Sequence, residues 1–292
     1  MQRADRVSIV TDSAASLPPG LAAEVGPGLQ VVSHQLMIDG TTYRDGLDLT
    51  AGEFYKTLRT LDQPPTTSAP SPAYFLEAFE TASAVSHSVI CLVTSPKFSA
   101  TRDSALIATR EASEKMPETR IEIVDTETAA GSGLLVLDAL RSAADGHGVD
   151  EIVTRTAALV PRVKVIAFLD TLYYVWKGGR VPMIAHFGTS LLQIKPVFEM
   201  YRGEVKTVSK TRTANRAKAK LIDLMHIDVG SRKLHAAVLH GDALDEAREM
   251  EGRIASEFDC AELYISEFSP VMGAHTGPGL LGLAYWSEGE AV

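Results

Sequence analysis

Short apolar runs rich in β-branched residues alternate with amphipathic stretches along most of this sequence. Three such runs in the first half, RVSIVTDS, HSVICLVTS and RIEIVDTET, each end in polar residues. The last two lead into helical stretches, one from about Ser99 and one over 130–144. This alternation predicts a layered α/β protein with a parallel sheet. The ligand sites of such sheets lie in the loops at the carboxyl ends of the strands.

Two further helix starts can be read from residues that cap helices. Thr50 is placed to cap a helix while Glu53 reaches back to it, as in a capping box. Ser71 is placed as an N-cap with Pro72 as the first helical residue, and aromatic side chains four residues apart follow on the buried face. Both segments are therefore predicted helices.

The second half of the chain has a different pattern. Two strands are predicted over 191–210, joined by a turn at Arg202–Gly203, and the rest alternates between helix and strand. The predicted helices are 211–226 and 243–256, and the predicted strands include 163–172, 234–241 and 263–268. With 292 residues, two packed domains are expected, with a boundary near 160–170.

Composition and charge exclude several function classes. The net charge of −9 and the pI near 5.4 argue against nucleic acid as a partner, because an acidic surface repels phosphates. No run of about 18 apolar residues and no secretory signal is present, which predicts a cytoplasmic protein. Paired carboxylates, a Cys/His cluster, a nucleophile elbow, a P-loop and a dinucleotide fingerprint are also missing from the sequence. We therefore expect no metal and no cofactor.

Four polar segments are candidates for ligand contact: 11–16, 65–71, 94–101 and 273–279. The first three are rich in hydroxyl groups, and the fourth places His275 between glycines. Neutral hydroxyls and helix N-termini suit a carboxyl group at the mouth of an apolar cavity. The alternative is that these residues only cap helices and form turns. The other seven histidines, His34 among them, are read as surface or core residues.

The segment YYVWKGGRVP at 173–182 combines aromatic, basic and glycine residues. Gly178 and Gly179 are expected to end a helix and to present Arg180 on an exposed turn. An arginine presented in this way suits a phosphate or an acidic partner surface. The alternative is a helix end whose basic residues complement the helix dipole.

Eight segments in order resemble the DegV family, over about residues 7 to 286. They are VSIVTDSAASLP, YRDGLDLTAGEFYKTL, PTTSAPS, VTSPKFSATRDSA, IVDTETAAGSG, LYYVWKGGRVP, LLQIKPVFEMYRGEV and SEFSPVMGAHTGPGLLGLAYW. The resemblance implies an α/β fold of two domains. These are an N-terminal α/β/α domain with a parallel sheet (1–165) and a smaller, two-layer α/β C-terminal domain (166–292), with the ligand at their interface.

The resemblance also implies a function. Family members are lipid-binding carriers, not enzymes: they bind one long-chain fatty acid in a buried tunnel. In many bacteria they present its carboxyl group to a separate fatty acid kinase subunit, which makes an acyl phosphate for phospholipid synthesis. Bound fatty acid, the kinase and peripheral membrane contact during acyl exchange are thus the expected partners.

The family's site residues carry over position by position. Thr66 matches the carboxylate-binding hydroxyl, with Thr67 and Ser68 adjoining it. His275 matches the family histidine near the carboxyl group, with Thr276 beside it. Arg180 matches the arginine implicated in meeting the kinase.

The third loop departs from the family pattern of two serines, any residue, a leucine and SGTY. Here it reads TSPKFSATR, so that Ser95 matches the first serine while Pro96 replaces the second. Ala100 replaces the glycine and Arg102 the tyrosine. Because Pro96 has neither a hydroxyl nor an N–H, either Ser95 or Ser99 is expected to take over the binding role.

Two rival functions stay open on the sequence. One is a stand-alone small-molecule kinase or transferase, since DegV proteins resemble dihydroxyacetone kinases in fold. The other is a sensor that binds acyl chains without presenting them.

Overall fold

The computed structural model describes residues 6–18, 20, 28–181 and 194–289. These residues form two compact units. Unit 1 lies within 1–35 and 67–161, and unit 2 within 36–66 and 162–292. The chain therefore passes between the units three times, and the segment 36–66 belongs with the C-terminal half.

The sheet of unit 1 is parallel throughout, as predicted. Its strands lie in the order β2 (Leu29–Val32), β1 (Val7–Asp12), β6 (Ser88–Val93) and β7 (Arg120–Asp125). In β6 every residue after Ser88 is buried, which explains its continuous apolar sequence. The carboxyl ends of all four strands meet at one edge of the sheet.

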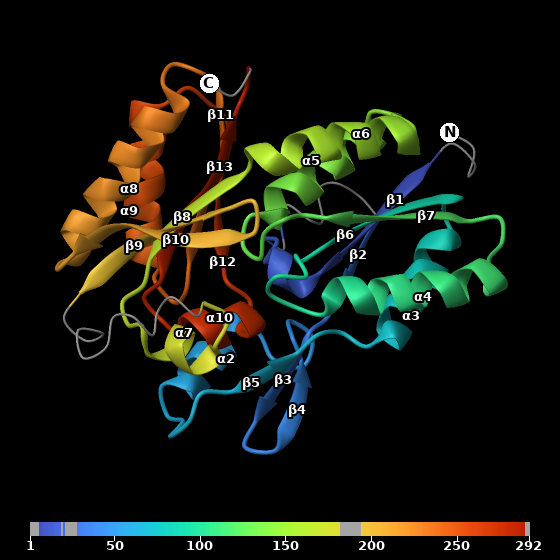
Figure 1. Cartoon of the computed structure of the whole chain (residues 1–292), viewed down its shortest axis with the longest axis horizontal. Coiled ribbons are helices and arrows are strands. Elements are labelled where there is room, and N and C mark those ends of the chain that lie inside the picture. The colour runs from blue at the N-terminus through green and yellow to red at the C-terminus, as the bar shows by residue number, and fades with distance from the viewer. Residues whose placement is uncertain (1–5, 19, 21–27, 182–193, 290–292) are drawn as a thin grey trace. The chain divides into compact units, whose positions relative to one another are not determined.

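Helices cover both faces of this sheet, which confirms the expected α/β/α layering (Figure 1). One face carries α3 (Pro72–Ser83) and α4 (Thr101–Lys115), and the other carries α5 (Ser132–Ala144) and α6 (Val149–Leu159). The predicted aromatic pair of α3, Phe75 and Phe79, is fully buried between α3 and the sheet. Ser71 is the N-cap residue of α3, although its side chain makes no capping hydrogen bond.

Unit 2 contains a six-stranded mixed sheet. The strand order is β10 (Glu204–Thr211), β9 (Lys195–Tyr201), β8 (Lys164–Phe168), β13 (Leu281–Ser287), β11 (Leu234–His240) and β12 (Cys260–Glu267). The pair β11–β12 is parallel and the other pairs are antiparallel. Helices α8 (Ala214–Val229) and α9 (Leu244–Glu257) lie side by side on one face, as expected for a two-layer arrangement (Figure 1).

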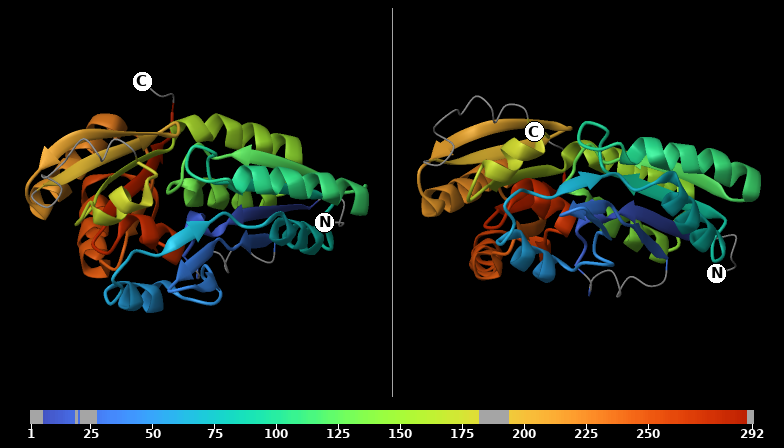
Figure 2. Two further views of the ribbon diagram at one scale, coloured as in Figure 1. Left: turned by 60° about the horizontal axis from the view of Figure 1, so that its bottom comes forward. Right: turned by 90° about the horizontal axis from the view of Figure 1, so that it is seen from below.

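The predicted turn at Arg202–Gly203 is present. It joins β9 and β10 into the hairpin at one edge of the sheet of unit 2 (Figure 2). Both turn residues have left-handed backbones, with φ of 50° and 70°. Two such residues in a two-residue turn match the right-handed twist of the strands. The predicted strand residues 191–193 lie outside the described residues.

The segment 36–66 and the residues that flank it form a small sheet and a helix. Strands β3 (Gln35–Ile38), β4 (Thr41–Arg44) and β5 (Thr66–Ser68) form a sheet in the order β4-β3-β5. Helix α2 (Ala51–Leu58) begins with the predicted capping box: Thr50 Oγ1 accepts the N–H of Glu53, whose carboxylate accepts the N–H of Thr50. Helix α2 packs against α10 (Pro270–Thr276) through Phe54, Tyr55 and Ala274.

Several element boundaries differ from the sequence prediction. Helix α4 begins at Thr101, two residues after Ser99, and α8 begins and ends three residues later than predicted. The segment 273–279 was read as a loop, but its first four residues complete α10. This helix contains Gly273 because the rings of Phe54 and Tyr55 lie against it: a methyl group there would lie 2.7 Å from the Tyr55 hydroxyl. Packing therefore outweighs the low helix propensity of glycine.

Among the described residues, no helix has both the length and the apolar character needed to cross a membrane.

Candidate functional site

The carboxyl end of β1 is organised by a buried aspartate. Asp12 Oδ1 accepts the N–H of Ala14 (3.1 Å) and the hydroxyl of Thr94 (2.9 Å), and Oδ2 accepts the N–H of Thr94 (2.7 Å). Asp12 is 1% exposed, so these three hydrogen bonds replace the water that a carboxylate requires. They join the ends of the two central strands, β1 and β6.

A chain of hydrogen bonds runs beside this carboxylate. Ser13 Oγ lies 3.2 Å from His34 Nδ1, and His34 Nε2 lies 3.1 Å from Thr101 Oγ1. Thr101 Oγ1 lies 2.7 Å from Ser99 Oγ. Ser13, His34 and Thr101 are buried, while Ser99 is half-buried. The sequence predicts His34 only as a surface or core residue. In the structure its ring connects two of the candidate polar segments, 11–16 and 94–101.

Ser95 and Ser99 belong to one tight turn in unit 1. The carbonyl of Ser95 accepts the N–H groups of Phe98 (3.0 Å) and Ser99 (3.2 Å). Ser95 is buried, with 2% of its surface exposed. Pro96 and Arg102, which depart from the family pattern, are both exposed. The turn thus brings together the two serines that the sequence offered as alternatives.

Thr66 and Thr67 lie in a strand and not in the predicted loop. Successive side chains of a strand point to opposite faces, so Thr66 and Ser68 share one side of β5 while Thr67 points to the other. Thr66 is exposed and Thr67 is half-buried. The two neighbouring threonines therefore do not act on one group from one face.

His275 and Thr276 occupy the last turn of α10, in unit 2. The hydroxyl of Thr276 donates to the carbonyl of Met272 (2.9 Å), within the helix. His275 packs against the backbone of Gly178, where an added methyl group would lie 2.5 Å from Nδ1. Helix α7 (Tyr173–Gly178) thus contacts the candidate histidine at a position that only glycine fits.

Arg180 follows the end of α7. Gly179 ends this helix with a left-handed backbone (φ 67°), as predicted, and Arg180 is exposed. Arg180 Nη1 donates to the carbonyl of Gly178 (2.7 Å). This hydrogen bond agrees with the second reading of the segment, in which a basic residue complements the helix end. The role of Arg180 in partner binding stays a prediction, and Pro182 lies outside the described residues.

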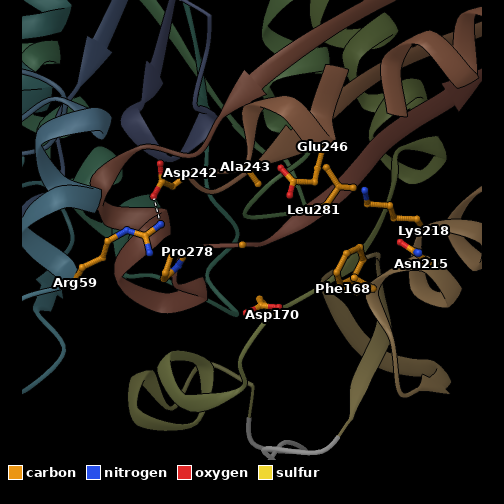
Figure 3. Close-up of a pocket in the computed structure, with 12 residues that line it drawn as sticks. Arg59, Phe168, Asp170, Asn215, Lys218, Asp242, Ala243, Glu246, Pro278 and Leu281 are labelled. Carbon is orange, nitrogen blue, oxygen red and sulfur yellow. Dashed lines mark hydrogen bonds and ion pairs between the residues drawn. The ribbon is translucent and has the colours of Figure 1, made fainter. Parts of the chain in front are cut away.

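A polar pocket of about 430 Å³ lies in unit 2, at the carboxyl ends of β8 and β11 (Figure 3). Its apolar floor includes Phe168 and Leu281, and its charged groups are largely paired. Asp242 forms an ion pair with Arg59, and Lys218 forms one with Glu249 (2.7 Å). None of the predicted site residues lines this pocket, and its polarity does not suit an acyl chain.

Beside this pocket His240 ends β11 and supports the start of α9. Its Nδ1 accepts the N–H of Ala243, the N-cap residue of α9 (3.3 Å). Burial lowers the pKa of His240, and the carboxylates of Asp242 and Glu246 offset this only in part. Glu267 also faces Nδ1, at 4.0 Å. The imidazole is therefore held neutral, with Nδ1 as an acceptor.

We expect His240 to make the folded state less stable as the pH falls. Its pKa in the folded state lies below the unfolded value of about 6.5, so the unfolded chain binds more protons below that pH. His240→Asn keeps an acceptor near the Nδ1 position but does not titrate. Between about pH 7.5 and pH 5.5, the urea midpoint of the wild type should fall more than that of the variant.

Tryptophan fluorescence measures this directly, because both tryptophans, Trp176 and Trp286, lie in unit 2. The raised pKa of His235, which is hydrogen-bonded to Glu262 and Glu288, has the opposite effect on stability. Both proteins contain His235, so its effect cancels in the difference. Equal pH dependences would show that His240 does not contribute.

No group of three or more His, Cys, Asp or Glu side chains that could hold a metal ion occurs within the described ranges.

Comparison with known proteins identifies relatives over nearly the whole length of the chain. Residues 6–288 match a family model described as "Uncharacterised protein, DegV family". A DegV domain-containing protein of Caldanaerobacter subterraneus subsp. tengcongensis is 33% identical over 285 residues, which are 96% of this chain and 99% of that protein.

Solved structures share the fold. A DegV family protein from Thermus thermophilus, described as binding fatty acid, has a TM-score of 0.88 and 28% identity, covering 97% of this chain and 100% of that one. A fatty acid binding DegV family protein from Streptococcus agalactiae has a TM-score of 0.84 and 25% identity, covering 97% and 99%.

Proposed function

Since this chain belongs to the DegV family, we propose that it is a carrier that binds one long-chain fatty acid. The observation that carries the proposal is the likeness to the Thermus thermophilus protein, which binds fatty acid and matches at both fold and sequence level. The likeness extends over 97% of this chain, so that both compact units are included.

The energetics suit an acyl ligand. Each buried methylene contributes about 0.8 kcal/mol, so a chain of about sixteen carbons offers on the order of 10 kcal/mol before entropy losses. A few neutral hydrogen bonds of about 1 kcal/mol each fix the position of the carboxyl group without dominating the affinity. The acyl tail thus supplies most of the affinity, and the polar residues fix the orientation of the ligand in its site.

The residues proposed to bind the carboxyl group are those that match the family's site: Ser95, Ser99, His275 and Thr276, with Thr66 or Thr67 according to which face of β5 meets it. Two buried or half-buried serines in one turn supply hydroxyl donors whose desolvation costs less than that of a charged side chain. We further propose that the chain presents this carboxyl group to a partner kinase, with Arg180 in the contact surface.

Native mass spectrometry of the purified protein tests the carrier function. One bound fatty acid per chain is expected, with less retained after Thr66→Ala or His275→Ala. Thr67→Ala is the matched variant on the other face of β5, and it reports which face meets the carboxyl group. A protein that is empty and also fails to take up added fatty acid would end the carrier hypothesis.

The kinase step needs separate experiments. A pull-down should capture a kinase that the Arg180→Ala variant captures less well. Failure to bind any kinase would favour a sensor. Turnover of a small substrate by this protein alone would favour an enzyme.

A further inference from the structure

His34 lies at the centre of a buried hydrogen-bond chain that ends on a proposed ligand-binding hydroxyl. The chain links Ser13, His34, Thr101 and Ser99, with successive distances of 3.2, 3.1 and 2.7 Å. All four residues belong to unit 1, and they follow the carboxyl ends of β1, β2 and β6 in its parallel sheet. Ser13, His34 and Thr101 are 7%, 3% and 0% exposed, and only Ser99, at the end of the hydrogen-bond chain, is half-buried.

The direction of these hydrogen bonds depends on which nitrogen of His34 carries the proton. If Nδ1 accepts, Nε2–H donates to Thr101, Thr101 donates to Ser99, and the Ser99 proton points outward. If Nδ1 carries the proton, every step reverses, and Ser99 offers only lone pairs outward. A carboxylate accepts hydrogen bonds and does not donate them, so it is bound only in the first case.

The hydrogen-bond partners of Ser13 favour the arrangement in which His34 Nδ1 accepts a hydrogen bond and Nε2 carries the proton. Ser13 Oγ already accepts the backbone N–H of His34 (3.0 Å). Its own proton has one acceptor within reach among the described residues, His34 Nδ1. In the reversed case this buried proton would be left unpaired, at a cost of about 1–3 kcal/mol. The nitrogen proton is therefore placed on Nε2.

The nearby carboxylate does not reverse this choice. Asp12 Oδ1 lies 3.8 Å from His34 Nδ1, beyond hydrogen-bond distance. Its oxygens already accept the N–H of Ala14 and both the N–H and the hydroxyl of Thr94. A catalytic triad is also excluded, because Ser13 and Asp12 both approach the same ring nitrogen.

We infer that His34 is a positioning residue that, through Thr101, fixes the Ser99 hydroxyl as a donor toward a bound carboxylate. The inference rests on the proposed function and deepens it, because it gives the head-group site its preference for the ionised acid. Because Pro96 replaces a serine and provides neither a hydroxyl nor an N–H, the Ser99 hydroxyl would supply the donor that this chain lacks at position 96.

The test compares stearate with octadecanol, which share one tail length. An alcohol both donates and accepts, so it pairs with Ser99 in either direction of the chain, whereas stearate requires a donor. Ser99→Ala should lower the preference for stearate over octadecanol about tenfold, the effect of one charge-assisted hydrogen bond. His34→Leu and Thr101→Val should each lower it at least about threefold.

A double-mutant cycle separates positioning from general damage. If His34 acts through Ser99, His34→Leu lowers the preference in the wild type but not in a Ser99→Ala background. Equal losses in both backgrounds would overturn the inference. His34→Gln, which keeps one acceptor and one donor, should restore much of the preference and provides a second variant if His34→Leu folds poorly.

Ser86→Ala is the matched control. Ser86 is as fully buried as Thr101 and is hydrogen-bonded to Ser8. It lies, however, at the opposite edge of the same sheet, where the strands begin. Ser86→Ala should lower the stability of the fold and leave the preference for stearate over octadecanol unchanged. A wild type that takes up neither stearate nor octadecanol would count against the carrier function. A wild type that binds both, with a preference that His34→Leu leaves unchanged, would overturn only the role of His34.

Discussion

Gly277→Ala is expected to destabilise unit 2 by about 3 kcal/mol. Gly277 ends α10 with φ 73° and ψ 176°, a backbone conformation that is essentially restricted to glycine. A methyl group there would also lie 2.2 Å from the Tyr174 ring, so the ring or the helix end must move. The backbone strain costs about 1–3 kcal/mol, and the overpacking adds a similar amount.

Urea unfolding followed by tryptophan fluorescence measures this effect, since both tryptophans lie in unit 2. Gly179→Ala is the matched control. Gly179 also has a positive φ, 67°, but among the described residues, its chain neighbours aside, no atom lies within 4 Å of an added methyl group. It should cost about 1–2 kcal/mol, the strain of a left-handed residue alone.

A second change isolates the clash. Adding Tyr174→Leu to Gly277→Ala removes the ring but keeps the strained backbone, so part of the lost stability should return. If Gly277→Ala were no worse than Gly179→Ala, the close approach of Tyr174 to α10 would be wrong. Because α10 carries His275, we also expect Gly277→Ala to retain less fatty acid than Gly179→Ala does.

Features that depend on neighbouring residues could be predicted from the sequence. Thr50 and Glu53 are three residues apart, and the capping box between them is present as predicted. The turn at Arg202–Gly203 needs two left-handed residues between strands, and the sequence pattern identified it. The parallel sheet of unit 1 also follows from its strand-to-helix units, since such connections join parallel strands.

Features that depend on distant residues could not be predicted in this way. His34 and Thr101 are 67 positions apart, and no periodicity relates them. The close packing of His275 on Gly178 is equally long-range, and the sequence indicates only that Gly178 lies at a helix end. Helix α10 could not be predicted because Gly273 and Gly277 indicate a loop. The packing against α2 that stabilises it involves residues over 200 positions earlier in the chain.

The largest expected effect on ligand binding comes from the length of the acyl tail. Each methylene removed from a saturated fatty acid should weaken binding about fourfold, because about 0.8 kcal/mol of apolar burial is lost. From about eighteen to about twelve carbons the loss should be on the order of a thousandfold. By contrast, removal of the Ser99 hydroxyl should cost only about tenfold.

Saturated fatty acids of different lengths are titrated, below their micelle concentrations, into protein from which bound lipid has been removed. The slope of the binding free energy against the number of carbons gives the contribution of each methylene. The cost of immobilising the ligand is similar along the series, so most of it cancels in the ratio of affinities. Ser99→Ala should shift all the affinities by one factor and leave the slope unchanged, since a head-group contact and a distant methylene act independently. Affinities that hardly change with tail length would mean that the tail stays in water. The length at which the slope flattens measures how many carbons this protein buries.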